Sequence, residues 1–125
     1  MLVERRKLMK AVEVIKKLYG NKFNVTTQYK MLKIKKALEE DEPIYQELFF
    51  SNLGDFLEKD EEGNYKGNET NGYIIKDECF GEAAGKIAEI MGMKIQVPDI
   101  YFSIDELEEL GLTMEEFEAF MDFIK

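Results

Sequence analysis

Apolar residues recur every three or four positions along the first 19 residues of the chain. The stripe consists of Leu8, Ala11, Val12, Ile15, Leu18 and Tyr19. Because mostly charged residues lie off this stripe, the pattern predicts an amphipathic helix from about Val3 to Tyr19. Gly20 and Asn21 follow directly, and both residue types tolerate the left-handed backbone that ends many helices.

A second helical region is predicted from Thr26 to Lys59, and the rest of the chain is arranged around it. Asn24, Thr26 or Thr27 is expected to cap its start, because each side chain can accept a hydrogen bond from a backbone amide one turn later. Proline lacks that amide and disfavours helix at the preceding residue, so we expect a kink or a short break near Asp41–Pro43.

The part of this region that follows Pro43 is apolar and rich in aromatic residues. It contains Ile44, Tyr45, Leu48, Phe49, Phe50, Leu53, Phe56 and Leu57. A stripe of this kind at helical spacing predicts core or the seam of a dimer, and a ligand surface is the alternative.

Residues 60–77 are polar and contain the turn dipeptides Gly63-Asn64 and Asn71-Gly72. These dipeptides predict an exposed hairpin with short strands at Asn64–Lys66 and Tyr73–Lys76. A mobile loop is the alternative interpretation.

A third helix is predicted from Asp77 or Glu78 to about Met91, because apolar residues form a wide face along it. Gly81 and Gly85 weaken this helix relative to alanine. They share a face with two alanines, so we expect another element to approach closely there.

Alternating apolar positions between residues 94 and 102 predict an edge strand or two short extended pieces. Ser103 with Glu106, and Thr113 with Glu116, have the spacing of capping boxes and predict two short helices. The apolar stripe expected on the last helix consists of Phe117, Phe120, Met121 and Ile124.

The predicted fold class is mainly α (α+β), with a long helical hairpin, a small β element and short C-terminal helices. The length of 125 residues suits a single domain, 1–125. Within it we expect a helical hairpin at 1–59, a polar hairpin or loop at 60–77, and a helix, an extended segment and C-terminal helices at 78–125.

Charge is distributed unevenly along the chain. The net charge is −9, but residues 1–36 hold eleven Lys or Arg against two acids, and residues 37–125 hold six against 24. One interpretation is that the basic and acidic parts pack together and neutralise each other. The other is that one face meets a charged external partner.

The residues of common catalytic and metal sites are missing from the sequence. There is no histidine, and Cys79 has neither a second cysteine nor a histidine to complete a zinc site or a nucleophilic pair. We therefore expect a protein that is not an enzyme and has no cofactor, with a carboxylate-only metal site as the alternative. No apolar run reaches the length of a transmembrane helix, so no membrane association is expected.

Several short strings in this order resemble a known family. They are Lys22-Phe23-Asn24-Val25-Thr26-Thr27-Gln28-Tyr29-Lys30, Asp60-Glu61-Glu62-Gly63-Asn64, Ile95-Gln96-Val97-Pro98-Asp99-Ile100, Ser103-Ile104-Asp105-Glu106-Leu107 and Leu112-Thr113-Met114-Glu115-Glu116-Phe117. The pattern is similar to that of small proteins from tailed phages and prophages of Gram-positive bacteria, catalogued as a domain of unknown function (DUF1617). The resemblance implies a phage origin and a location in the host cytoplasm or the virion, and it carries over no functional residues.

The leading functional hypothesis is a non-enzymatic phage accessory protein that acts through protein–protein contacts, in the virion or in its assembly. The partner would be a second copy of the chain or another phage or host protein. The alternative is an acidic inhibitor of a host defence protein that imitates nucleic acid. Nucleic-acid binding by the basic residues is disfavoured by the overall acidity. The expected interaction surface consists of Lys30, Lys33, Lys36, Phe49, Phe50 and Phe56.

Overall fold

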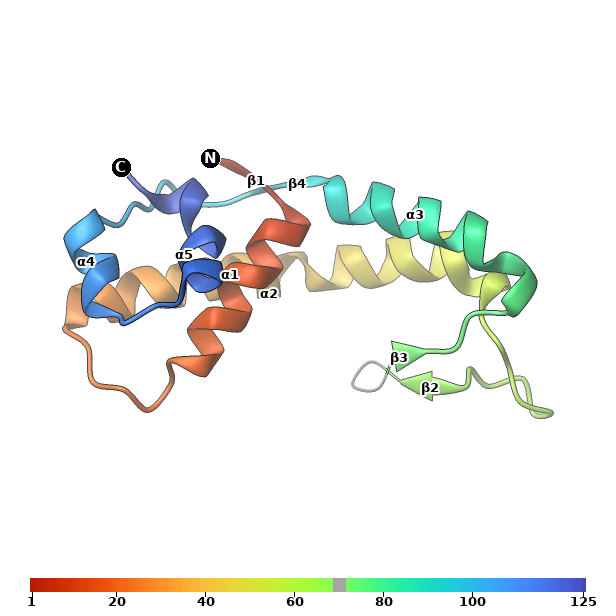
Figure 1. Ribbon diagram of the computed structural model, residues 1–125. Helices are drawn as coiled ribbons and strands as arrows, with labels where there is room; N and C mark the ends of the chain where they lie inside the picture. The colour runs from red at the N-terminus through yellow and green to blue at the C-terminus, as the bar shows by residue number, and fades with distance from the viewer. Residues whose placement is uncertain (69–71) are drawn as a thin grey trace. The chain divides into compact units, whose positions relative to one another are not determined.

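The computed structural model describes residues 1–68 and 72–125 and is mainly helical with small antiparallel β elements, which confirms the predicted fold class (Figure 1). The chain forms two compact units. Unit 1 comprises Met1–Glu42 and Gly92–Lys125, and unit 2 comprises Pro43–Met91. One long helix, α2 (Val25–Leu53), contributes its first part to unit 1 and its second part to unit 2.

Unit 1 opens with a short strand that local pattern did not predict. β1 (Leu2–Glu4) pairs antiparallel with β4 (Lys94–Gln96), so the predicted start of the first helix at Val3 is wrong. The helix α1 begins at Arg5, after the strand pairing ends, and runs to Lys17. Gly20 follows with φ +94°, which confirms the predicted stop.

The core of unit 1 is built from α1, the first part of α2 and the C-terminal segments. Phe102, Phe120 and Phe123 are fully buried, and the rings of Phe102 and Phe120 meet edge to face with 5.6 Å between centroids. Arg5 on α1 is buried and forms an ion pair with Asp41 on α2. The predicted contact between the first helix and the long helical region is therefore present.

Both predicted capping boxes are present at the C-terminal helices α4 (Ile104–Glu109) and α5 (Met114–Ala119). The expected stripe on the last helix is partly wrong. The α-helix ends at Ala119 and a 3-10 turn, η3 (Met121–Phe123), follows it. Met121 is exposed and Phe123 is buried, because the Phe123 carbonyl accepts a 2.6 Å hydrogen bond from the Phe102 amide and turns the chain there.

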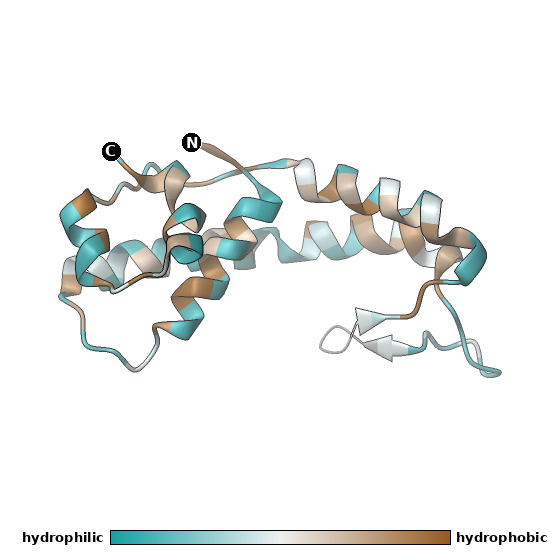
Figure 2. Ribbon diagram, viewed as in Figure 1, coloured by the Kyte–Doolittle hydropathy of each residue, from teal (hydrophilic) through white to brown (hydrophobic). Residues whose placement is uncertain are grey.

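The long helix begins as expected and continues where a kink or break was expected. The Asn24 side chain accepts a 2.8 Å hydrogen bond from the Thr27 amide, which confirms a cap at this end. Pro43 lies inside α2, and the helix continues to Leu53, so a break near Asp41–Pro43 is wrong. Figure 2 shows that the middle of α2 is polar.

Unit 2 contains the second part of α2, a 3-10 turn η1 (Gly54–Phe56), a hairpin of β2 (Gly67–Asn68) and β3 (Gly72–Tyr73), a second turn η2 (Asp77–Cys79) and the helix α3 (Phe80–Gly92). Figure 1 shows α3 running in the direction opposite to α2. The hairpin is predicted correctly, but its ladder is shifted from the expected strands. Single bridges join the preceding segment to both sides of the hairpin, Lys59 to Tyr65 and Leu57 to Ile75.

The two predicted turn dipeptides of this hairpin have different outcomes. Gly63 has φ +86°, and the Asp60 carboxylate accepts hydrogen bonds from the amides of Glu62 and Asn64, so a turn is present there. Asn71, the first residue of the other dipeptide, lies outside the described residues.

The predicted close approach at the glycines of α3 is wrong. A Cβ atom added at Gly81 or Gly85 would meet no atom of the described residues within 4 Å. Ala83 and Ile90 are the buried residues of α3, and the face that holds the glycines is open.

Candidate protein-binding site

Five aromatic side chains gather in unit 2, and we call them the aromatic cluster: Tyr45, Phe49, Phe50, Tyr65 and Tyr73. The first three come from the second part of α2, the fourth from the chain leading to β2, and the last from β3. All five side chains are half-buried, so each keeps part of its surface open to solvent.

Phe50 is the centre of the aromatic cluster. Its ring centroid lies 5.3 Å from that of Phe49, 5.4 Å from that of Tyr65 and 5.4 Å from that of Tyr73. The contact with Tyr65 is stacked, and the other two are edge to face. Such pairs contribute about 0.5–1.5 kcal/mol each beyond the burial of area. The rings therefore fix one another in orientation.

Backbone hydrogen bonds hold the hairpin that supplies the two hairpin tyrosines. The Glu58 amide donates to the Ile74 carbonyl at 2.7 Å, and the Lys66 amide donates to the Glu58 carbonyl at 3.0 Å. Gly67 has φ +89°, and a Cβ added there would lie 2.1 Å from the carbonyl oxygen of Gly72. Only glycine fits where the backbone of residue 67 approaches that of Gly72, so the position of the hairpin tyrosines depends on Gly67.

Two of the three predicted phenylalanines belong to the aromatic cluster. Phe56 does not, because its ring has no contact with another aromatic ring in the described part of the chain, although its carbonyl accepts a 2.8 Å hydrogen bond from the Lys76 amide. Tyr65 and Tyr73 were not predicted as site residues. The sequence places them on the two sides of the predicted hairpin. That both contact the ring of Phe50 depends on the strand register, which the sequence did not predict.

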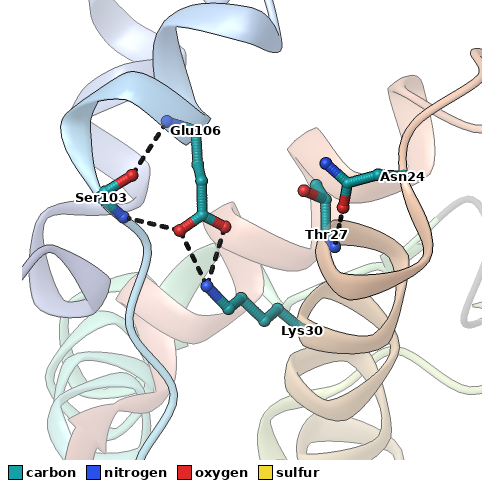
Figure 3. A network of polar contacts seen from close by, with 5 residues as sticks. All are labelled: Asn24, Thr27, Lys30, Ser103 and Glu106. Carbon is teal, nitrogen blue, oxygen red and sulfur yellow. Dashed lines mark hydrogen bonds and ion pairs between the residues drawn. The ribbon is translucent and has the colours of Figure 1, made fainter.

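Lys30, one of the predicted surface lysines, is engaged inside unit 1 (Figure 3). Its ammonium group lies 2.8 and 2.9 Å from the two carboxylate oxygens of Glu106, and 5.4 Å from the ring centroid of Phe102. Hydrogen bonding from Lys30, and then from the Ser103 backbone, holds the pKa of Glu106 below its usual value. One carboxylate thus caps α4 and ties it to α2.

Lys33 and Lys36 remain exposed on α2. The ammonium group of Lys33 lies 5.4 Å from the ring centroid of Tyr29 on the same helix. Tyr29 and Leu32 are 58% and 55% exposed, so this face of α2 carries both charge and apolar surface. Lys33 and Lys36 are therefore more open to an external partner than Lys30, whose side chain is 22% exposed.

A second surface feature of unit 1 was not predicted. A groove of about 740 Å³ lies between α1 and the α5–η3 segment, and we call it the α1–α5 groove. Its first wall carries four cationic side chains and one acid, which are Arg6, Lys7, Lys10, Lys17 and Glu13. Its second wall carries Glu115, Glu116, Glu118 and Asp122. The spacing of these residues along each helix was visible in the sequence, but their opposition across a groove depends on the packing of α1 against α5.

Other kinds of site find no support in residues 1–68 and 72–125. No group of three or more His, Cys, Asp or Glu side chains within these ranges is placed to hold a metal ion. No helix within them is long and apolar enough to span a bilayer. No family model, curated protein or solved structure matches the chain.

Proposed function

We propose that the protein acts by binding another protein through the aromatic cluster of unit 2, with no chemical step of its own. The observation that supports this proposal is that five aromatic rings are half-buried side by side and hold one another in place. Tyrosine is enriched among the residues that dominate binding energy at protein interfaces, and aromatic side chains in general are enriched there.

Preorganisation favours binding by this surface. In the aromatic cluster, the rings of Phe49, Tyr65 and Tyr73 already contact Phe50 in the free protein. Little side-chain entropy therefore remains to be lost on association. The ammonium group of Lys59 lies 5.1 Å from the ring centroid of Tyr65 and adds a positive charge beside the rings. A partner surface with apolar side chains and a nearby carboxylate would match this arrangement.

The proposed setting is a tailed phage, with the protein in the virion or in its assembly, and it rests on the resemblance of the short sequence strings. The alternative, an acidic inhibitor that imitates nucleic acid, would need a surface of one charge sign. The α1–α5 groove places lysines opposite the acids of α5, so unit 1 gives this alternative no support.

The test compares two variants of exposed aromatic residues within unit 2. Tyr65→Ala removes a cluster ring, and Phe80→Ala removes a ring that is 55% exposed and has no ring contact in the described part of the chain. A protein captured by the wild type should be purified and titrated against all three forms. We expect at least about tenfold weaker binding for Tyr65→Ala and unchanged binding for Phe80→Ala.

Equal affinity of the wild type and Tyr65→Ala for every purified partner would refute the proposed site. Circular dichroism of each variant must first show the helical content of the wild type. This check separates loss of the binding surface from loss of unit 2.

A further inference from the structure

The α1–α5 groove has walls of opposite net charge that neutralise each other only in part. The pKa of Glu116 is lowered by hydrogen bonding from Thr113 and, to a smaller extent, by the charge of Lys17 on the other wall. Lys7 and Lys10 on the first wall have no carboxylate of the described residues within 4.0 Å, and the same is true of Glu118 and Asp122 with respect to cations. All four side chains are exposed. The groove therefore presents a positive and a negative stripe, both open to a partner.

The floor between the stripes is apolar. Val14 and Ala119 are buried there, and Met121 is 58% exposed. Four cationic and five acidic side chains line the groove, a balance of −1 in a chain whose net charge is −9. The groove is thus a nearly neutral region of a strongly acidic protein, and a second acidic chain meets little net repulsion there.

We propose that the α1–α5 groove binds a second copy of this chain about a two-fold axis that runs along the groove. Such an axis places the α1 stripe of one copy against the α5 stripe of the other, and the reverse on the opposite side. After a two-fold rotation about this axis, each stripe of one copy faces the stripe of opposite sign on the other copy. A surface of one sign would repel itself.

A second copy fits the groove better than the other kinds of ligand. Small-molecule sites are lined mainly by apolar and aromatic side chains, whereas charged side chains dominate both walls here. A nucleic acid would meet the acidic wall, which repels phosphate. The partner has to carry both signs at the same separation, and the chain itself does so.

Charge-swap variants test this arrangement directly. The first variant is Lys7→Glu with Lys10→Glu, and the second is Glu118→Lys with Asp122→Lys. Each puts like charges opposite each other twice in a homodimer, so we expect sedimentation equilibrium at 0.15 M salt to show dissociation constants at least about tenfold higher than that of the wild type.

An equimolar mixture of the two variants supplies the decisive measurement. In the mixed dimer the new acids of one chain face the new lysines of the other, and the unchanged walls also face opposite signs. We expect the mixture to recover a mass of twice 14.6 kDa at concentrations where each variant alone is monomeric. Net charge does not explain this result, since the second variant is less acidic than the wild type and still loses association.

The control is Lys22→Glu with Lys94→Glu, which makes the same change in charge at two exposed positions of unit 1 that do not line the groove. It should leave the dissociation constant within about threefold of the wild-type value, because the change adds only long-range repulsion that salt screens beyond roughly 8 Å. A monomeric wild type at about 1 mM, a mixture that stays monomeric, or a control that dissociates as readily as the groove variants would each overturn the proposal.

Discussion

Glu106→Gln separates the two roles of the side chain that links α4 to α2. Glutamine keeps the capping box, since its amide oxygen can still accept from the Ser103 backbone, but it removes the charge that faces Lys30. The Lys30 and Glu106 side chains are 22% and 27% exposed. Exposed pairs contribute about 0.2–1 kcal/mol, and hydrogen bonds to charged groups about 1.5–3 kcal/mol. We expect a loss of about 1 kcal/mol in the free energy of unfolding.

A double-mutant cycle with Lys30→Met isolates the pair. The coupling energy from urea unfolding should be about 1 kcal/mol. Glu116→Gln is the matched control, because Glu116 completes the other capping box. The pKa of Glu116 is lowered mainly by a hydrogen bond from the Thr113 backbone, and no lysine forms an ion pair with it among the described residues. Glu116→Gln should lower the free energy of unfolding by no more than a few tenths of a kcal/mol.

The effect of Glu106→Gln should depend on pH in a defined direction. The pKa of Glu106 is lower in the folded chain than its usual value of 4.5, so the folded state favours the charged carboxylate. The stabilisation is complete above the unfolded pKa and is lost as the pH falls through the folded pKa. The difference between the wild type and Glu106→Gln should therefore shrink below about pH 4. A coupling energy near zero, or a difference that grows with acid, would refute this reasoning.

Three further substitutions test the packing of the two units. Gly85→Ala should raise the free energy of unfolding by about 0.5–1 kcal/mol in thermal or urea unfolding, since a Cβ there meets only open space and alanine favours helix. Gly67→Ala should destabilise the hairpin by more than about 1 kcal/mol and speed amide exchange at Lys66, since both its φ and its contact with Gly72 exclude a side chain. Phe120→Ala should cost about 3–5 kcal/mol in urea unfolding, because its ring is fully buried.

The features predicted correctly are those that a few neighbouring residues decide. The Asn24 cap and both capping boxes depend on hydrogen bonds that span three residues, so their spacing in the sequence is sufficient. The glycine stop after α1 is equally local. The aromatic rings of the second part of α2 also pack against one another, as large rings at helical spacing are expected to do.

The features that were missed depend on residues far apart in the chain. β1 is three residues long and exists because β4, some 90 residues later, supplies its hydrogen bonds. The last helix ends early because Phe102 pairs with Phe123. Of the two expectations at Pro43, a kink or a break, the break is wrong, because α2 continues through it. Periodicity carries no information about any of these partners.

Unit 1 is discontinuous in the sequence, and this affects the order in which its parts leave the ribosome. Residues 43–91 emerge as one continuous stretch, so the contacts of unit 2 can form as soon as Met91 is free. The apolar stripe of α1 is synthesised early but has to wait for Phe102, Phe120 and Phe123. During that interval residues 1–42 present uncovered apolar surface to chaperones and proteases. A chain that stops at Met91 should accordingly be cleaved by protease within residues 5–17 while residues 43–91 stay protected, and equal protection of both ranges would contradict this order.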